Sequence, residues 1–173
     1  MTNFTVDPER TSVWIDARSS LHAIKTESSG MTGHIEATLQ PEGGLDLSVP
    51  VSARLEMPLS SMSSGNPLYD REMQRRTDAR RYPKISADLK SLTSHGSDGR
   101  YTAAGDVTFR GVTREVSDVV TLSSPEPGVL VFEGEHVFSL PDFNMEPPKI
   151  MMLKVYPDVT VRVRIVASEA ADA

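Results

Sequence analysis

Apolar and polar residues alternate along most of this chain, from Val13 almost to Ala167. Strict alternation predicts β-strands with one buried and one wet face. The segment GDVTFRGVTREV, residues 105–116, shows the pattern clearly, because the alternation breaks at Arg110-Gly111 and resumes beyond it. This arrangement predicts two strands joined by a tight turn, with Val107, Phe109 and Val116 facing the same side.

The same alternation predicts about eight strands. Turn-forming clusters rich in Gly, Pro, Asp and Ser separate several of them, and strands joined by short turns are antiparallel neighbours. The expected strands cover residues 13–18, 31–39, 45–56, 85–89, 101–109, 116–122, 129–140 and 155–166.

One segment, residues 66–83, departs from the alternation and predicts a helix. Asn66 is a favourable N-cap, Pro67 suits the first helical position, and Pro83 ends the pattern. Acidic residues come early and arginines late, as the helix dipole favours. We interpret the charges as a solvated face, and the apolar stripe consists of Leu68, Tyr69 and Met73.

Eight long antiparallel strands either close into a barrel or fold into a sandwich. Many positions on the predicted inward face are small, and small residues leave volume inside an eight-stranded barrel. We therefore expect an all-β, eight-stranded antiparallel barrel with one short helix and an internal cavity. Alternatively, the small residues only accommodate bulky neighbours across the barrel. The small inward residues are Gly33, Ala37, Ala53, Ala87, Ala103 and Gly105.

Composition narrows the class of protein. The 173 residues suit one domain spanning 1–173, and a net charge of -6 without a long basic run disfavours nucleic acid as a partner. The absence of cysteine excludes disulfides and thiol catalysis. No apolar stretch reaches the roughly 20 residues of a membrane-spanning helix, so stable membrane insertion is not expected.

The N-terminal residues carry Asp7, Glu9, Arg10 and Asp16 and contain no uninterrupted apolar run of the kind found in signal peptides. A cytoplasmic protein is expected if Met1 is the natural start. A periplasmic or secreted protein is the alternative, if a signal peptide was removed.

Four segments resemble the YceI-like family along nearly the whole chain. The most specific are RYPKI at 81–85, where the family has Tyr-Pro between helix and strand, and residues 105–116, which resemble its Gly-x-Leu-Thr-x-x-Gly-Val-Thr-x-x-Val signature. The resemblance implies a lipocalin-like barrel, with a helix near one end, that sequesters an isoprenoid or another long amphiphile. It also implies a homodimer.

The chain departs from the family pattern at polar positions. Asp16-Ala17-Arg18-Ser19 stands where the family has Asp-x-x-His-Ser, Glu27 stands at a later histidine, and Pro141-Asp142-Phe143-Asn144 replaces Arg-x-Asp-Phe-Gly. Polar groups near a barrel mouth select the ligand's head group. The resemblance therefore supports the assignment of the fold more strongly than the assignment of the ligand.

Ligand-binding candidates follow from the inward phase of the strands, and plain core packing is the alternative for each of them. Arg18 could grip an anionic head group or form a surface ion pair with Asp16. Methionines adapt to irregular surfaces and could form a lip, and Pro147-Pro148 is a hypothetical gate. The lining candidates are Leu21, Ile35, Leu47, Val107, Phe109, Val120 and Val161, and the lip candidates are Phe143, Met145, Met151 and Met152.

Binding without catalysis is the predicted activity, and no catalytic residue, metal or cofactor is assigned. His34 and Glu36, with His22 or His136, offer only loose metal-ligand spacing, so we interpret the histidines as solvent-facing. The alternative is an enzyme acting on a hydrophobic small molecule inside the barrel, for which Asp142, Glu146 and His136 are the candidates. A second alternative is an empty structural barrel that contacts another protein.

Overall fold

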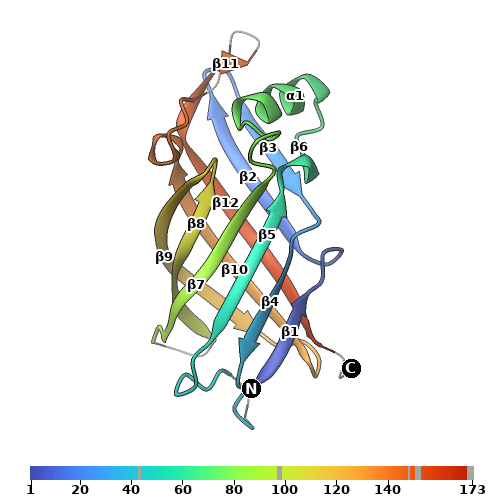
Figure 1. The fold of residues 1–173 in the computed structure, drawn as a ribbon, viewed down its shortest axis with the longest axis vertical. Coiled ribbons are helices and arrows are strands. Elements are labelled where there is room, and N and C mark those ends of the chain that lie inside the picture. Colours follow the sequence, from blue (N-terminus) through green and yellow to red (C-terminus); the bar gives the residue numbers. More distant parts are fainter. Residues whose placement is uncertain (43, 97–98, 148, 151–152, 171–173) are drawn as a thin grey trace.

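The computed structural model describes residues 1–42, 44–96, 99–147, 149–150 and 153–170. It shows an elongated antiparallel β-barrel, with helix α1 (Pro67–Arg76) at one end and β1 at the other (Figure 1). Short 3-10 helices η1 and η2 span Leu59–Ser61 and Leu140–Phe143. The strands are β1 (Thr2–Val6), β2 (Ser12–Ser19), β3 (Ala23–Ser28), β4 (Thr32–Ala37), β5 (Ser52–Pro58), β6 (Met62–Ser63), β7 (Lys84–Ser94), β8 (Arg100–Phe109), β9 (Val112–Ser123), β10 (Val129–Ser139), β11 (Lys149–Ile150) and β12 (Leu153–Glu169).

The wall closes through the long last strand. The circuit runs β1-β4-β5-β7-β8-β9-β10-β12 and returns to β1 through the pairs Phe4↔Glu169 and Val6↔Ala167. Beyond β1, the same edge of β12 pairs with β2, which carries β3 and β6 toward α1 (Figure 1). The predicted eight-stranded antiparallel barrel is confirmed, because its edges are joined rather than left open.

The β8–β9 turn has the geometry that its sequence predicts. Phe109 pairs with Val112, and the two residues between them, Arg110 and Gly111, have φ angles of 54° and 74°. Two left-handed residues match the twist of a hairpin. A Cβ on Gly111 would lie 2.9 Å from the ring of Tyr82, so this position suits glycine for both conformation and space.

Helix α1 begins as predicted. The Asn66 side chain accepts hydrogen bonds from the N–H groups of Leu68 (3.0 Å) and Tyr69 (3.4 Å), which caps the first turn. The helix ends at Arg76, earlier than Pro83. Tyr69 and Met73 pack against the barrel, whereas Leu68 is 54% exposed, so the apolar stripe is narrower than predicted.

The strand predicted over residues 45–56 is wrong in its first half, since β5 starts at Ser52. Leu45 makes a single bridge to Leu39, and the Asp46 carboxylate accepts hydrogen bonds from the N–H and hydroxyl of Ser48. Pro50 has no N–H to offer a sheet. The segment is therefore a loop stabilised by its own side chains, although Leu45 is buried.

The barrel end near β1 is filled by side chains, and we call this part the solid end. Phe4, Ala37 and Ala167 are completely buried and Leu130 is 1% exposed. The hydroxyl of buried Tyr101 accepts a hydrogen bond from the Leu45 N–H at 3.1 Å, which holds the loop over this core. The solid end closes one side of the interior, so an open volume can lie only farther toward α1.

Candidate functional site: the hollow section and its polar pair

Between the solid end and α1 the barrel is hollow, and we call this part the hollow section. It contains a middle cavity of about 280 Å³ and a helix-side cavity of about 270 Å³. Both volumes lie close to the lower end of the range of small-molecule sites. The two cavities share part of their wall and therefore adjoin. The shared residues are Leu55, Ala87, Val107, Phe138, Val161, Val163 and Ile165.

Small inward residues produce the middle cavity, as the sequence predicts. Ala53, Ala87, Ala103 and Gly105 all line it, and at Gly105 an added Cβ would collide with the Asp88 carbonyl. The prediction is wrong for the other two small residues. Ala37 belongs to the solid end, and Gly33 lines neither cavity.

Five of the seven predicted lining residues face the hollow section. Leu47 instead packs against the core of the solid end. Leu21 is 79% exposed in the turn between β2 and β3, so the prediction that it faces inward is wrong. The turn carries it out of the strand alternation on which that prediction depended. The five are Ile35, Val107, Phe109, Val120 and Val161.

Two of the predicted lip residues, Phe143 and Met145, are buried and line the helix-side cavity. The Phe143 ring packs against Phe109 and Phe138, with centroid distances of 5.7 and 6.1 Å. Phe143 and Met145 therefore form part of the packed wall of this cavity. The other lip residues, Met151 and Met152, and Pro148 of the proposed gate lie outside the described residues, so these hypotheses stay predictions.

Arg18 does not face the cavity. Ile15 and Ala17 of β2 line the helix-side cavity, and Arg18 takes the alternate, outward position and is exposed. Among the described residues it forms no ion pair, so the predicted partner Asp16 does not hold it either. Arg18 is therefore not placed to contact a ligand inside the barrel.

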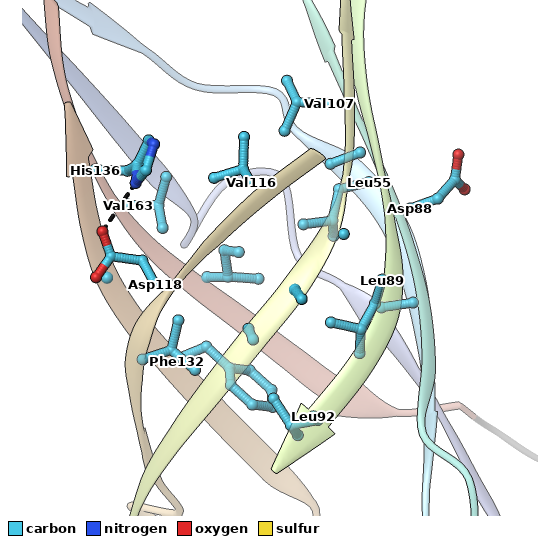
Figure 2. A pocket seen from close by; sticks show the side chains of 18 of the residues that line it. Leu55, Asp88, Leu89, Leu92, Val107, Val116, Asp118, Phe132, His136 and Val163 are labelled. Carbon is cyan, nitrogen blue, oxygen red and sulfur yellow. Dashed lines mark hydrogen bonds and ion pairs between the residues drawn. The ribbon is translucent and has the colours of Figure 1, made fainter. Parts of the chain in front are cut away.

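A histidine and a carboxylate interrupt the apolar wall of the middle cavity. Asp118 in β9 lies opposite Ala103, and His136 in β10 lies opposite Val161, so both take inward positions. His136 Nδ1 and Asp118 Oδ2 are 2.8 Å apart (Figure 2), and the Val119 N–H donates to Asp118 Oδ1 at 2.8 Å. The hydrogen bond from His136 holds the pKa of Asp118 below its usual value.

The other carboxylates of the middle-cavity wall are turned outward. Both carboxylate oxygens of Asp88 accept from a single nitrogen of Arg54, Nη1, at 2.8 and 2.7 Å, and Asp88 points away from the cavity in Figure 2. Asp106 lies 3.4 Å from the Lys90 ammonium. Their charges are therefore compensated on the outer surface. Glu135 takes the outward position next to His136 in β10 and is exposed, so the Asp118–His136 pair is the polar group that the described wall presents to the middle cavity.

Sequence reasoning missed this pair. The interpretation of His136 as solvent-facing is only part of the picture: its side chain is 31% exposed, but the ring also lies in the cavity wall and packs edge-on against Phe138 with centroids 4.7 Å apart. Its partner is Asp118, whereas the predicted catalytic neighbours Asp142 and Glu146 are both exposed. The available signal was the alternation within each strand. His136 lies two positions before Phe138, and Asp118 lies two positions before Val120, so each polar residue shares the inward face of its apolar neighbour.

Neither a metal site nor a membrane-spanning helix is found in the part of the chain that the structure describes. No group of three or more potential metal-ligating side chains comes together there. None of the helices in that part is long and apolar enough to cross a bilayer. His34, which the sequence analysis interprets as solvent-facing, is exposed on β4.

Comparisons with known proteins agree with this architecture. A model of the YceI-like domain family matches residues 4–167. BcnA from Burkholderia cenocepacia is 17% identical, with a TM-score of 0.78 over 94% of this chain and 99% of that one. A structure described as a polyisoprenoid binding domain from Saccharophagus degradans is 11% identical, with a TM-score of 0.79 over 98% and 100%. The Campylobacter jejuni YCEI protein is 12% identical, with a TM-score of 0.66 over 86% of both chains. No curated protein sequence matches significantly.

Proposed function

The chain belongs to the YceI-like family, and on that basis we propose that it sequesters or carries a long apolar amphiphile, such as an isoprenoid, inside the hollow section. The observation that carries this proposal is the paired cavities of about 280 and 270 Å³, lined almost entirely by aliphatic and aromatic side chains. A ligand that fits such a wall must itself be mostly apolar.

The physical driving force is the removal of apolar surface from water, which contributes about 0.8 kcal/mol for each buried methylene. The two cavities adjoin through shared wall residues, so a long tail that occupies both gains more than a compact ligand held in one. The Saccharophagus degradans structure with the same fold is described as a polyisoprenoid binding domain, which supports an isoprenoid tail here.

A chain-length series tests the proposal. Linear alcohols of increasing length should displace a bound neutral fluorophore, N-phenylnaphthylamine, with affinity rising by up to about fourfold per methylene until the hollow section is full. Affinity should then reach a plateau. No displacement by any length, or an affinity that does not depend on length, would contradict the proposal.

The enzyme alternative gains no support from its predicted residues, because Asp142 and Glu146 lie on the surface while His136 pairs with Asp118. The homodimer and the cytoplasmic location stay predictions. Light scattering of the purified protein would test the first, and fractionation of the source cells would test the second.

A further inference from the structure

The barrel wall is incompletely paired beside the Asp118–His136 pair. The β9–β10 ladder covers four residue pairs, from Val131↔Ser123 to Gly134↔Val120. Beyond it, β9 stays paired with β8 as far as Val112, and β10 stays paired with β12 as far as Ser139. Within these fully described strands, residues 112–119 and 135–139 therefore face each other without ladder pairs, and we call this part of the wall the seam.

Side chains hold the two edges of the seam. Asp118 and His136 bridge it just beyond the last ladder pair. Farther toward α1, the ring of Phe143 packs against Phe109 and Phe138 on either side. The Asp118 side chain is 46% exposed and that of His136 is 31% exposed, although both residues line the middle cavity. The pair thus stands at the boundary between apolar interior and water, where the head of an amphiphile would lie.

The chemistry of the pair favours hydrogen-bond donors. A carboxylate can only accept, so the hydrogen of the 2.8 Å bond belongs to His136 Nδ1. In the neutral ring, this tautomer leaves Nε2 as an acceptor. Asp118 has accepting capacity beyond its bonds to His136 and the Val119 N–H. A ligand hydroxyl can donate to either group, whereas a quinone carbonyl, which only accepts, cannot.

The charge of the pair disfavours anionic heads. The lowered pKa of Asp118 keeps its carboxylate ionised at neutral pH, and a like charge placed against it is repelled. Arg114, four positions earlier on the same face of β9, is exposed and does not line the cavity; its guanidinium donates to the Thr113 carbonyl. A carboxylate or diphosphate head group at this place would therefore be repelled by the Asp118 carboxylate.

We propose that Asp118 and His136 form the head-group site for an uncharged amphiphile with a hydroxyl group, whose tail occupies the hollow section. The inference rests on the proposed function and goes beyond it, since it names the class of head group. It selects a long-chain alcohol over the corresponding carboxylate, diphosphate or quinone.

The test compares three ligands with closely similar tails at neutral pH. Geranylgeraniol, geranylgeranyl diphosphate and the hydrocarbon phytane compete with N-phenylnaphthylamine for the wild-type protein. The alcohol should bind about tenfold or more tightly than the diphosphate, as expected for hydrogen bonds to a charged group. Because this preference needs no variant, it does not depend on how a mutant folds. Equal binding of alcohol and diphosphate would overturn the inference.

Variants then assign the preference to the pair. Asp118→Asn, which is nearly isosteric, should reduce the ratio of alcohol to diphosphate affinity by about tenfold and change phytane affinity by less than about twofold. His136→Gln should also weaken alcohol binding. Glu133→Gln is the matched control, since Glu133 is exposed in β10 and lines neither cavity, and it should leave the ratio unchanged. An unchanged ratio in Asp118→Asn would overturn the inference, while failure of all three ligands to bind would overturn the proposed function as well.

Discussion

The solid end and the hollow section are built from the same barrel wall, yet only one of them is filled. At the solid end, Phe4 and Leu130 have almost no exposed surface and belong to one buried core cluster. In the hollow section, inward positions carry Ala87, Ala103 and Gly134, and cavities remain. The comparison shows that residue size at inward positions, rather than the strand arrangement, decides whether this barrel is a core or a container.

The largest expected effect comes from truncating a large side chain at the solid end. Phe4→Ala should lower the free energy of unfolding by about 3–5 kcal/mol, because it removes a fully buried ring and leaves a void in close-packed surroundings. Phe132→Ala is the matched variant, since Phe132 is only half-buried and already borders the middle cavity. Denaturant titration should show a smaller loss of unfolding free energy for Phe132→Ala than for Phe4→Ala. Equal losses would mean that the two regions are packed alike.

The same enlargement should have opposite consequences in the two regions. Ala37→Leu should destabilise the protein by about 1–3 kcal/mol, because Ala37 is completely buried in the solid end. Ala87→Leu should leave the free energy of unfolding unchanged or raise it, because Ala87 borders both cavities. Thermal unfolding of the two variants checks this pair of expectations.

Ala87→Leu should also weaken binding of a long-chain alcohol by about tenfold, because it fills the wall where the two cavities adjoin. Ala37→Leu lies outside the cavities and should keep the wild-type affinity of the folded protein. If Ala87→Leu bound ligand normally, the cavities would not be the site of the tail.

The smallest effect concerns the stability contributed by the Asp118–His136 pair. The pKa of Asp118 is lowered from 3.8 in the folded state. The stability contributed by the pair is therefore present above pH 3.8 and is lost as the pH falls through the lower pKa of the folded state. Asp118→Asn should cost less than about 1 kcal/mol at neutral pH, since the Asp118 side chain is 46% exposed and screened by solvent. Melting temperatures of variant and wild type should converge in strong acid. A difference that persisted there would assign the effect to packing.

Much of the fold could be predicted from strand phase because burial on one face imposes alternation. Val107, Phe109 and Val116 all line the hollow section, as their alternation across the Arg110-Gly111 turn predicts. The N-cap at Asn66 was readable for a local reason, since the capping bonds join residues two and three positions apart. The loop at residues 45–51 misled because it alternates like a strand while Asp46 and Pro50 favour a turn.

Strand phase could not predict that Asp118 pairs with His136, because the pairing depends on the register between two strands. The two residues lie 18 positions apart, and the β9–β10 register, continued two positions beyond Gly134↔Val120, places them opposite each other. The register of a hairpin is set by the turn that joins its strands, which alternation along one strand does not report. Leu21 failed for a related reason, since the turn after β2 removes it from the strand phase.

Native mass spectrometry of the freshly purified protein most directly tests the claim that the hollow section is a container. The intact protein should be heavier than the denatured chain by the mass of a lipid, and an organic extract of the same sample should contain a molecule of that mass. The Ala87→Leu variant should carry less of it. A native mass equal to that of the bare chain, in protein that also takes up no long-chain alcohol when one is supplied, would contradict the account.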